Sequence, residues 1–289
     1  MIIIENKKLR AVISSKGAEL QSLFNKETGL EYMWGGDAAF WGKHSPVLFP
    51  IVGSLKEDTY YYNEKKYQLP RHGFAREKIF LQDQVSNEEA VFTLVADAST
   101  LAVYPFLFSF TLRYTLIKNT LTCSYNIVNT DLKEMLFSVG AHPAFAVPMV
   151  DGTSYHDYYL EFNKAEILNR FKIAGGGLIS ENSEVLPMLD NKLLLQHDLF
   201  YDDAIVLKHI TSDSITLGCT QHGHGIKFDF KNFPFFGIWS AKDANFVCLE
   251  PWCGIADSVN ATQQLNDKEG IIILEPTGVW QKEWTVECY

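Results

Sequence analysis

The chain has 289 residues and a formal net charge of −10, from 25 basic and 35 acidic side chains. Such a surface repels phosphate backbones, so nucleic acid is not an expected partner. Hydrophobic residues make up 47% and charged residues 21% of the chain, which is typical of a globular protein and excludes a disordered one.

The N-terminal segment MIIIENKKLR places a short apolar run before its charges, the reverse of the order in a signal peptide. No stretch reaches about 18 uninterrupted apolar residues, and no basic run suggests a membrane surface, so a membrane is not an expected partner. The cysteines are Cys123, Cys219, Cys248, Cys253 and Cys288. Their odd number and the lack of a CxxC pair predict reduced thiols in a cytoplasmic protein.

Alternation of apolar and polar residues with period two dominates the chain. The segment EAVFTLVAD predicts a strand over residues 89–97. A hairpin follows, with a turn at residues 118–119 and one buried face on each strand. Its expected buried positions are Phe108, Phe110, Leu112, Tyr114, Leu116, Leu121, Cys123, Tyr125 and Ile127.

Two later segments, GIKFDF at residues 225–230 and WTVECY at residues 284–289, also predict strands, and residues 190–200 predict a short helix. The 20 Phe and 13 Tyr residues suit a large β core. No composition break, linker or repeat divides the chain. We therefore expect one all-β domain over residues 1–289, a sandwich of many antiparallel strands.

Two apolar stretches each contain a polar residue with catalytic potential. His142 lies in residues 136–147, where Pro143 favours an extended backbone, and either a hydrogen-bonded core histidine or a functional one fits the pattern. Glu250 ends the apolar run of FVCLEPW, where burial would raise its pKa toward that of a general base. A strand-end carboxylate in water is the alternative. Glu275, in IIILEPTG, has the same Leu-Glu-Pro pattern, and local chemistry does not separate the two glutamates.

Other polar groups give weaker signals. The segment LPRHGFAR places Arg71, His72 and Arg76 close together, which indicates either an anion or polyol site or a turn with solvated charges. Asp202 and Asp203 precede an apolar strand and also fit a charged turn. The pair in QHGHG, residues 221–225, has metal-ligand spacing but no third ligand nearby, and its glycines favour a hairpin tip, so no metal site is predicted.

Taken together, these segments resemble the aldose 1-epimerase (galactose mutarotase-like) superfamily, and in particular its LacX-like bacterial branch. The resemblance runs along nearly the whole chain, in the order KHSPVLFPIVGSL, LPRHGFAR, SVGAHPAF, LFYDDAIVL, FPFFGIWS and VCLEPWCG. It implies a large twisted antiparallel β-sandwich (supersandwich) with an open sugar-binding cleft, in agreement with the period-two pattern. The implied partner is a small-molecule sugar, a hexose or hexose phosphate, and neither a metal nor an organic cofactor is implied.

The resemblance also implies a reaction, the interconversion of α and β anomers by opening and closing of the sugar ring. His142 matches the general acid and Glu250 the general base, whereas Glu275 falls where the family shows no catalytic residue. His72 matches a second active-site histidine. Asp203 matches an aspartate that binds sugar hydroxyls, with Asp202 as the alternative after a shift of one position.

The chain departs from the family pattern at one loop. Galactose mutarotases carry an arginine in the loop that matches FPIVGSL, where this chain has Gly53 and Ser54. Arg71 and Arg76 are candidates to replace it, and the sequence leaves open whether they bind hydroxyls, a phosphate or carboxylates, or whether Arg76 is structural.

Two tryptophans, Trp239 and Trp280, could stack on a sugar, with core packing favoured for Trp280. A non-catalytic sugar-binding or regulatory module on the same fold is the second hypothesis for the function. A carbohydrate hydrolase or lyase is the third, disfavoured because a glycosidase needs two carboxylates where this chain offers histidines opposite Glu250.

Overall fold

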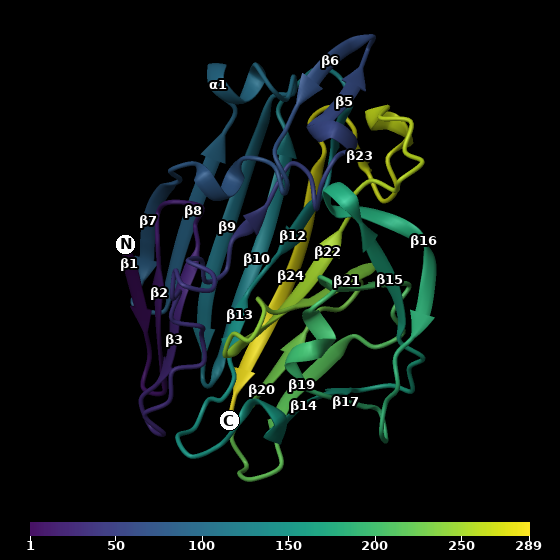
Figure 1. The fold of residues 1–289 in the computed structure, drawn as a ribbon. Helices are drawn as coiled ribbons and strands as arrows, with labels where there is room; N and C mark the ends of the chain where they lie inside the picture. The colour runs from purple at the N-terminus through teal and green to yellow at the C-terminus, as the bar shows by residue number, and fades with distance from the viewer.

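The computed structural model describes residues 1–289, and antiparallel sheets form its framework (Figure 1). The largest sheet has nine strands and contains the predicted hairpin, with Thr120 opposite Ile117 at its turn. Across the sheet the strands are β17 (Lys192–Leu194), β14 (Tyr158–Phe162), β19 (Ser214–Cys219), β20 (Ile226–Asp229), β24 (Val279–Cys288), β10 (Thr120–Asn129), β9 (Phe108–Ile117), β8 (Glu89–Val95) and β7 (Leu81–Ser86). All nine predicted buried positions of the hairpin are buried.

The second large sheet carries the candidate site. Across the sheet its strands are β16 (Leu178–Val185), β15 (Asn169–Ala174), β18 (Ile205–Lys208), β21 (Phe235–Trp239), β22 (Phe246–Cys253), β12 (Val139–Ala141) and β4 (Val47–Leu48), and β13 (Ala144–Ala146) pairs with the first half of β22. In Figure 1 the strands β22, β21, β15 and β16 of this sheet lie to the right of the long strands β8, β9, β10 and β24.

Smaller elements complete the chain. A three-stranded sheet contains β1 (Ile2–Glu5), β2 (Leu9–Ile13) and β3 (Leu20–Asn25), and two-stranded sheets pair β5 (Thr59–Tyr62) with β6 (Lys65–Gln68) and β11 (Met135–Phe137) with β23 (Ile272–Leu274). The α-helix is α1 (Ala98–Leu101). The 3₁₀ turns are Lys56–Asp58, Ala75–Glu77, Tyr155–Asp157, Gly175–Gly177, His197–Phe200 and Leu265–Asp267.

The helix predicted over residues 190–200 is wrong. Asp190 and Asn191 adopt positive φ angles of 48° and 62°, which make a tight turn and end any helix. The strand β17 follows and pairs with β14 at the edge of the nine-stranded sheet. Only residues 197–200 form a helical turn, of the 3₁₀ type. Tertiary pairing at the sheet edge thus overrides a short local pattern.

The strand β22 separates the main core from the site. All eight of its residues are buried, and side chains on a strand alternate between the two faces of its sheet. Val247, Leu249 and Cys253 belong to the main hydrophobic core, which also includes side chains of the nine-stranded sheet. Residues 246, 248, 250 and 252 therefore occupy the opposite face, where two small hydrophobic clusters lie. Burial on both faces explains why β22 is almost continuously apolar.

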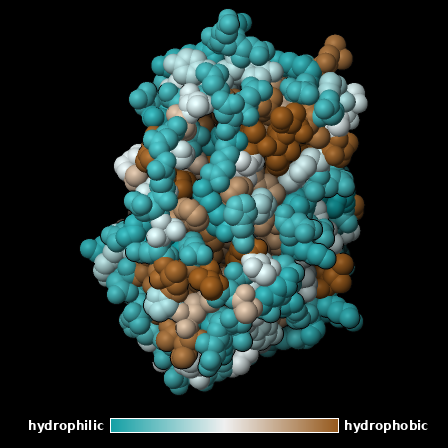
Figure 2. Space-filling view, turned by 90° about the vertical axis from the view of Figure 1, so that its right-hand side faces the viewer, coloured by the Kyte–Doolittle hydropathy of each residue, from teal (hydrophilic) through white to brown (hydrophobic).

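The outer surface offers only separate apolar areas on the side viewed in Figure 2, where hydrophobic patches are divided by hydrophilic side chains. No helix of the structure is long and apolar enough to cross a bilayer.

Trp280 packs partly buried against the main core, edge-on to Phe137, with ring centroids 5.6 Å apart. The expected packing role of Trp280 is therefore confirmed. All five cysteines are buried and unpaired, as expected.

A buried ion pair fastens the segment that follows β22. Lys268 Nζ lies 2.8 Å from Asp257 Oδ1 and also donates to the carbonyl of Ile255 at 2.6 Å. The second carboxylate oxygen of Asp257 accepts from the backbone N–H of Lys56 at 3.0 Å. The side chains of Lys268 and Asp257 are 3% and 4% exposed, so removal of either leaves the other charge buried without compensation.

We expect Asp257→Asn to lower the free energy of unfolding by about 3–5 kcal/mol, because it leaves the Lys268 ammonium buried opposite a neutral amide. Urea denaturation of the purified variant measures this loss. The matched control is Glu27→Gln, which breaks an exposed pair with Lys8 and should cost no more than about 1 kcal/mol. Equal losses in the two variants would contradict the importance of the buried pair.

Candidate active site

A cavity of about 380 Å³ lies on the face of the eight-stranded sheet opposite the main core. This volume suits a small ligand such as a monosaccharide. Its polar lining consists of Arg71, His72, Arg76, His142, Asp203 and Glu250, and its other lining residues are Trp41, Gly53, Ile173, Gly177, Ile179, Ala204, Val206, Trp239, Trp252 and Ala256. The candidate site residues named in the sequence analysis thus all line one cavity, Trp239 included. These candidates come from five separate segments of the sequence.

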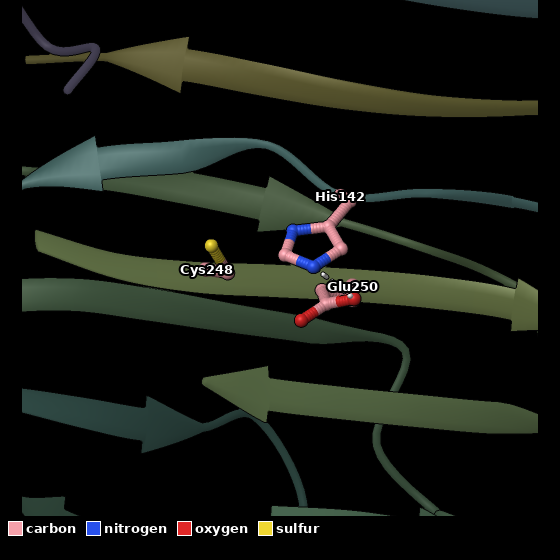
Figure 3. Close-up of side chains that lie close together, drawn as sticks. All are labelled: His142, Cys248 and Glu250. Carbon is pink, nitrogen blue, oxygen red and sulfur yellow. Dashed lines mark ion pairs between the residues drawn. The ribbon is translucent and has the colours of Figure 1, made fainter. Parts of the chain in front are cut away.

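The floor of the cavity holds His142 and Glu250 in direct contact. Glu250 projects from β22, and His142 lies between β12 and β13. The N–H of Leu249 donates to the carbonyl of Pro143 at 3.1 Å, which fastens the His142 segment to β22. His142 Nε2 lies 3.3 Å from Glu250 Oε2, as Figure 3 shows. Both residues are less than a tenth exposed.

Burial controls the charge of this pair. It raises the pKa of Glu250 well above the usual carboxyl value, with Arg71 and the indole N–H of Trp252 acting in the opposite direction. Burial also lowers the pKa of His142, and the positive charges of Arg76 and Arg71 act in the same direction. Removal of water thus favours the neutral forms of both groups. A carboxyl group whose pKa is raised by burial is a candidate general base.

Aromatic rings surround His142. Trp41 stacks on the imidazole, with ring centroids 5.0 Å apart and planes inclined by 27°, and Trp239 meets it edge-on at 5.6 Å. Trp252 lies across the neighbouring strand β21, where a Cβ on Gly237 would come within 2.4 Å of its ring. Only glycine permits this close approach of ring and backbone. The rings exclude water from the acid–base pair and give the cavity flat apolar walls.

The loop of His72 is held by two reciprocal hydrogen bonds with Gly53. The His72 N–H donates to the Gly53 carbonyl at 2.8 Å, and the Gly53 N–H donates to His72 Nδ1 at 3.1 Å. Because Nδ1 accepts a hydrogen bond, the neutral imidazole carries its proton on Nε2. Burial lowers the pKa of His72, with His142 and the two arginines adding to the effect, so the neutral form is favoured. His72 is therefore a hydrogen-bond donor through Nε2.

Gly53 itself is required at this position. Its φ is +72°, and a Cβ would lie 2.4 Å from the Cβ of Ala256. Ala256 precedes Asp257, whose N–H donates to the carbonyl of Ser54 at 2.9 Å. The buried Asp257–Lys268 pair thus supports the loop that orients His72. This loop, which has Gly53 and Ser54 where the resemblance implied an arginine, holds His72 in place.

Charged groups occupy the other wall. Arg71 Nη2 lies 3.9 Å from Asp203 Oδ2, too far for a hydrogen bond, and the Arg71 side chain is 45% exposed. Asp203 Oδ1 accepts from the N–H of Ala204 at 2.7 Å, and the buried Arg170 donates to the Asp203 carbonyl at 3.3 Å. Arg76 Nη2 donates to the carbonyl of Arg71 at 2.8 Å, which stiffens the loop. Arg76 thus has a structural contact in addition to its place in the cavity wall.

Several residues considered from the sequence lie outside the cavity. Asp202 is exposed and not part of its lining, in contrast to Asp203, and Glu275 is exposed beyond β23. His222 lies in the turn between β19 and β20, with Nε2 3.0 Å from the hydroxyl of Tyr158. The structure therefore separates Glu250 from Glu275 and Asp203 from Asp202 by position.

The sequence analysis assigned no site role to three residues that lie near the site. Trp41 lies in an irregular segment before β4, and Arg170 lies on β15, between β16 and β18. Cys248 lies two residues before Glu250, and this spacing on a strand places both side chains on one face. That last signal was present in the sequence. The first two depend on tertiary packing.

Comparison with known proteins gives the family. The aldose 1-epimerase family matches residues 1–287. The chain belongs to the aldose 1-epimerase family. Protein LacX of Lactococcus lactis subsp. lactis, in its plasmid and chromosomal forms, is 32% identical over 294 residues, which cover 99% of this chain and 98% of LacX.

Solved structures of the family agree. A galactose mutarotase related enzyme from Lactobacillus acidophilus has a TM-score of 0.95 and 35% identity, with 100% of this chain and 97% of that chain covered. A galactose mutarotase-like protein from Lactobacillus casei has a TM-score of 0.93 and 35% identity over the full length of both chains. The predicted family and the predicted antiparallel β fold are confirmed.

We expect Glu250→Gln to stabilise the protein increasingly as the pH rises. The folded-state pKa of Glu250 is raised, so the wild-type protein is most stable below the usual carboxyl pKa and loses stability above it. The glutamine variant has no such loss. The difference in unfolding free energy should grow by up to about 1.4 kcal/mol for each pH unit between the unfolded and folded pKa values.

Denaturant titrations between pH 4 and pH 8 measure this difference. The matched control is Glu275→Gln, which changes an exposed glutamate in the same tripeptide context and should show no such trend. A difference that is constant with pH, or that shrinks as the pH rises, would contradict the raised pKa.

Proposed function

We propose that the protein is an aldose mutarotase, which interconverts the α and β anomers of a hexose or hexose phosphate. The observation that carries this proposal is the 3.3 Å approach of His142 Nε2 and Glu250 Oε2 on the floor of a cavity of sugar size. Anomerisation requires that one proton be removed and one be supplied at two oxygens of the same anomeric carbon. An imidazole and a carboxyl group in contact with each other are suited to this task.

In ring opening, Glu250 takes the proton of the O1 hydroxyl and His142 gives a proton to the ring oxygen O5. The C1–O5 bond breaks and a carbonyl forms at C1. After rotation about C1–C2, His142 takes back the O5 proton and Glu250 returns a proton to O1, which closes the ring on the other face. Each cycle restores the starting protonation state, so no proton is consumed.

The electrostatics of the floor favour the open-chain stage. During ring opening the pair passes from ionised Glu250 and protonated His142 to the neutral forms of both. Burial raises the pKa of Glu250 and lowers that of His142, which are the shifts that stabilise this neutral pair. A low-dielectric floor therefore lowers the free energy of the open-chain intermediate relative to the same step in water.

Other wall residues bind and orient the sugar in this proposal. His72 donates from Nε2 to the ring oxygen or a neighbouring hydroxyl, and Asp203 accepts from sugar hydroxyls. Trp239 and Trp41 offer ring surfaces to the apolar face of the sugar. Asp203 is oriented by its hydrogen bond from Ala204, which fixes the direction of its carboxylate.

The charge of the wall favours a substrate with an anionic substituent. The charges of Glu250 and His142 cancel both in the ionised and in the neutral form of the pair, so the cavity presents the guanidinium groups of Arg71 and Arg76 against the single carboxylate of Asp203. Arg71 is half-exposed and has no hydrogen bond from its guanidinium to Asp203, so its donors are free for a ligand. We therefore place a sugar phosphate ahead of a neutral hexose as the substrate.

We expect purified protein to accelerate equilibration of fresh α-D-glucose, α-D-galactose or glucose 6-phosphate above the buffer rate. Glu250→Gln and His142→Asn should each lower kcat by about 10²–10⁴, the usual contribution of a general acid or base. Polarimetry and NMR exchange measure the rates. Glu275→Gln is the control and should retain full activity.

Two other outcomes have clear meanings. Saturable sugar binding with no change in the anomerisation rate would replace the mutarotase with a sugar-binding module. Release of reducing ends from a glycan would instead indicate a hydrolase. Full activity of Glu250→Gln would remove Glu250 as the base.

We expect Arg71→Gln to raise KM for glucose 6-phosphate at least about tenfold, because a hydrogen bond to a charged group is worth about 1.5–3 kcal/mol. KM for glucose should stay nearly constant, since a neutral sugar lacks the anionic partner. Arg10→Gln, on β2 and outside the cavity, serves as the control. An equal effect on both sugars would assign Arg71 to a shared hydroxyl instead of a phosphate.

A further inference from the structure

The indole N–H of Trp252 is a buried hydrogen-bond donor beside the proposed base. Trp252 follows Glu250 by two residues on β22, so both side chains lie on the same face of the strand, and both line the cavity. Trp252 is 6% exposed, and its Nε1 has no hydrogen-bond partner. A buried donor without a partner is costly and rare in folded proteins, so this one requires an explanation.

Two glycines on the neighbouring strands confine the indole ring. Gly140 on β12 pairs with Trp252, and a Cβ there would lie 2.7 Å from Cδ1 of the ring. A Cβ on Gly237, on β21, would lie 2.4 Å from Cζ2 and 3.2 Å from Cε2. Cδ1 and Cε2 are the two carbons bonded to Nε1. The N–H is therefore held in one direction by backbone on both sides.

This direction brings the N–H toward Glu250. Gly237 is the residue that pairs with Glu250 between β21 and β22, and the Cα atoms of paired residues lie about 4.5–5.5 Å apart. The ring edge that reaches Gly237 thus also comes close to the Glu250 side chain. Burial raises the pKa of Glu250, whereas the indole N–H of Trp252 lowers it as a hydrogen-bond donor to the carboxylate.

We propose that Trp252 is the positioning residue of Glu250, whose indole N–H closes onto the carboxylate when Glu250 ionises and orients it toward the O1 hydroxyl of the sugar. A base must be ionised before it takes a proton, and burial alone opposes ionisation. A hydrogen bond to the charged form favours it, and a donor on a confined ring needs little reorganisation. The kinetic consequences rest on the proposed function, whereas the contact itself does not.

The other ionisable groups around Glu250 come from several elements. His142 contacts Oε2 from between β12 and β13, Arg71 approaches from the loop after β6, and Asp203 from the turn before β18. Arg71 lowers the pKa of Glu250 and Asp203 raises it. Cys248 precedes Glu250 on the same strand face. Removal of the indole N–H changes none of these groups, so its effect on the titration of Glu250 can be measured separately.

The first test is Trp252→Phe, which removes the N–H and keeps an aromatic ring between the two glycines. We expect Glu250 to titrate at higher pH, as measured by ¹³C NMR of the glutamate carboxyl carbons, with its signal assigned by its absence in Glu250→Gln. Trp280→Phe makes the same change outside the cavity and should leave this titration unchanged. Circular dichroism and thermal melting check folding. An unchanged Glu250 titration in folded Trp252→Phe would overturn the proposal.

A second measurement needs no change at Trp252. The chain has six tryptophans, and ¹⁵N labelling of their indole nitrogens makes each N–H visible by NMR. One indole proton should move downfield as the pH rises and Glu250 ionises, because its hydrogen bond becomes charge-assisted. The movement should be absent in Glu250→Gln. The same movement in both proteins, or none in the wild type, would contradict the contact even if Trp252→Phe does not fold.

The kinetic test is the pH profile of anomerisation. Trp252→Phe should lower kcat about 10- to 100-fold near neutral pH, the factor expected for a lost hydrogen bond to a charged group, with KM nearly unchanged. The loss should shrink as the pH rises and Glu250 ionises without help. A raised KM at constant kcat would make the N–H a sugar-binding donor and overturn the positioning role. Absence of anomerisation in the wild type would count against the proposed function alone, because the two NMR titrations still test the contact.

Discussion

The site depends on the burial of β22 on both faces. A central strand with no solvent-exposed side must be apolar at nearly every position, and Glu250 is its one ionisable carboxyl group. The face opposite the main core is covered by tryptophans and by the His142 segment, which is fastened to β22 through Leu249. Glu250 therefore meets an imidazole instead of water. The acid–base pair and the apolar cavity walls both follow from this arrangement.

This arrangement reduces stability and provides reactivity for the same reason. Desolvation that raises the pKa of Glu250 makes its ionised form costly in the folded protein. The surrounding structure compensates with buried contacts that hold the loops in place, among them the Asp257–Lys268 pair and the reciprocal hydrogen bonds between His72 and Gly53. His72 has a positive φ of +69°, which is a strained backbone conformation, and these contacts hold it in place. The desolvated carboxyl group and the strained backbone both lie where the sugar is expected to bind.

Prediction from the sequence succeeded where a pattern is both local and repeated. The hairpin of β9 and β10 follows from alternation over ten residues on each strand. One face of each strand must be buried, and a register slip of one residue would turn the apolar side chains to solvent. The segment at residues 190–200 failed for the opposite reason. Its pattern is short, and pairing with β14 together with two left-handed residues determined its structure.

The sequence by itself determined the fold class, the family and the candidate residues His142, Glu250, His72 and Asp203, because these lie in short motifs whose order is readable along the chain. The resemblance already favours Glu250 over Glu275, and the tertiary structure adds the physical difference, since burial is set by neighbouring strands and not by the Leu-Glu-Pro context that both share. The tertiary structure alone brought Trp41 onto His142 and Arg170 under Asp203. Contacts between segments distant in the sequence depend on sheet order and register, which no local pattern contains.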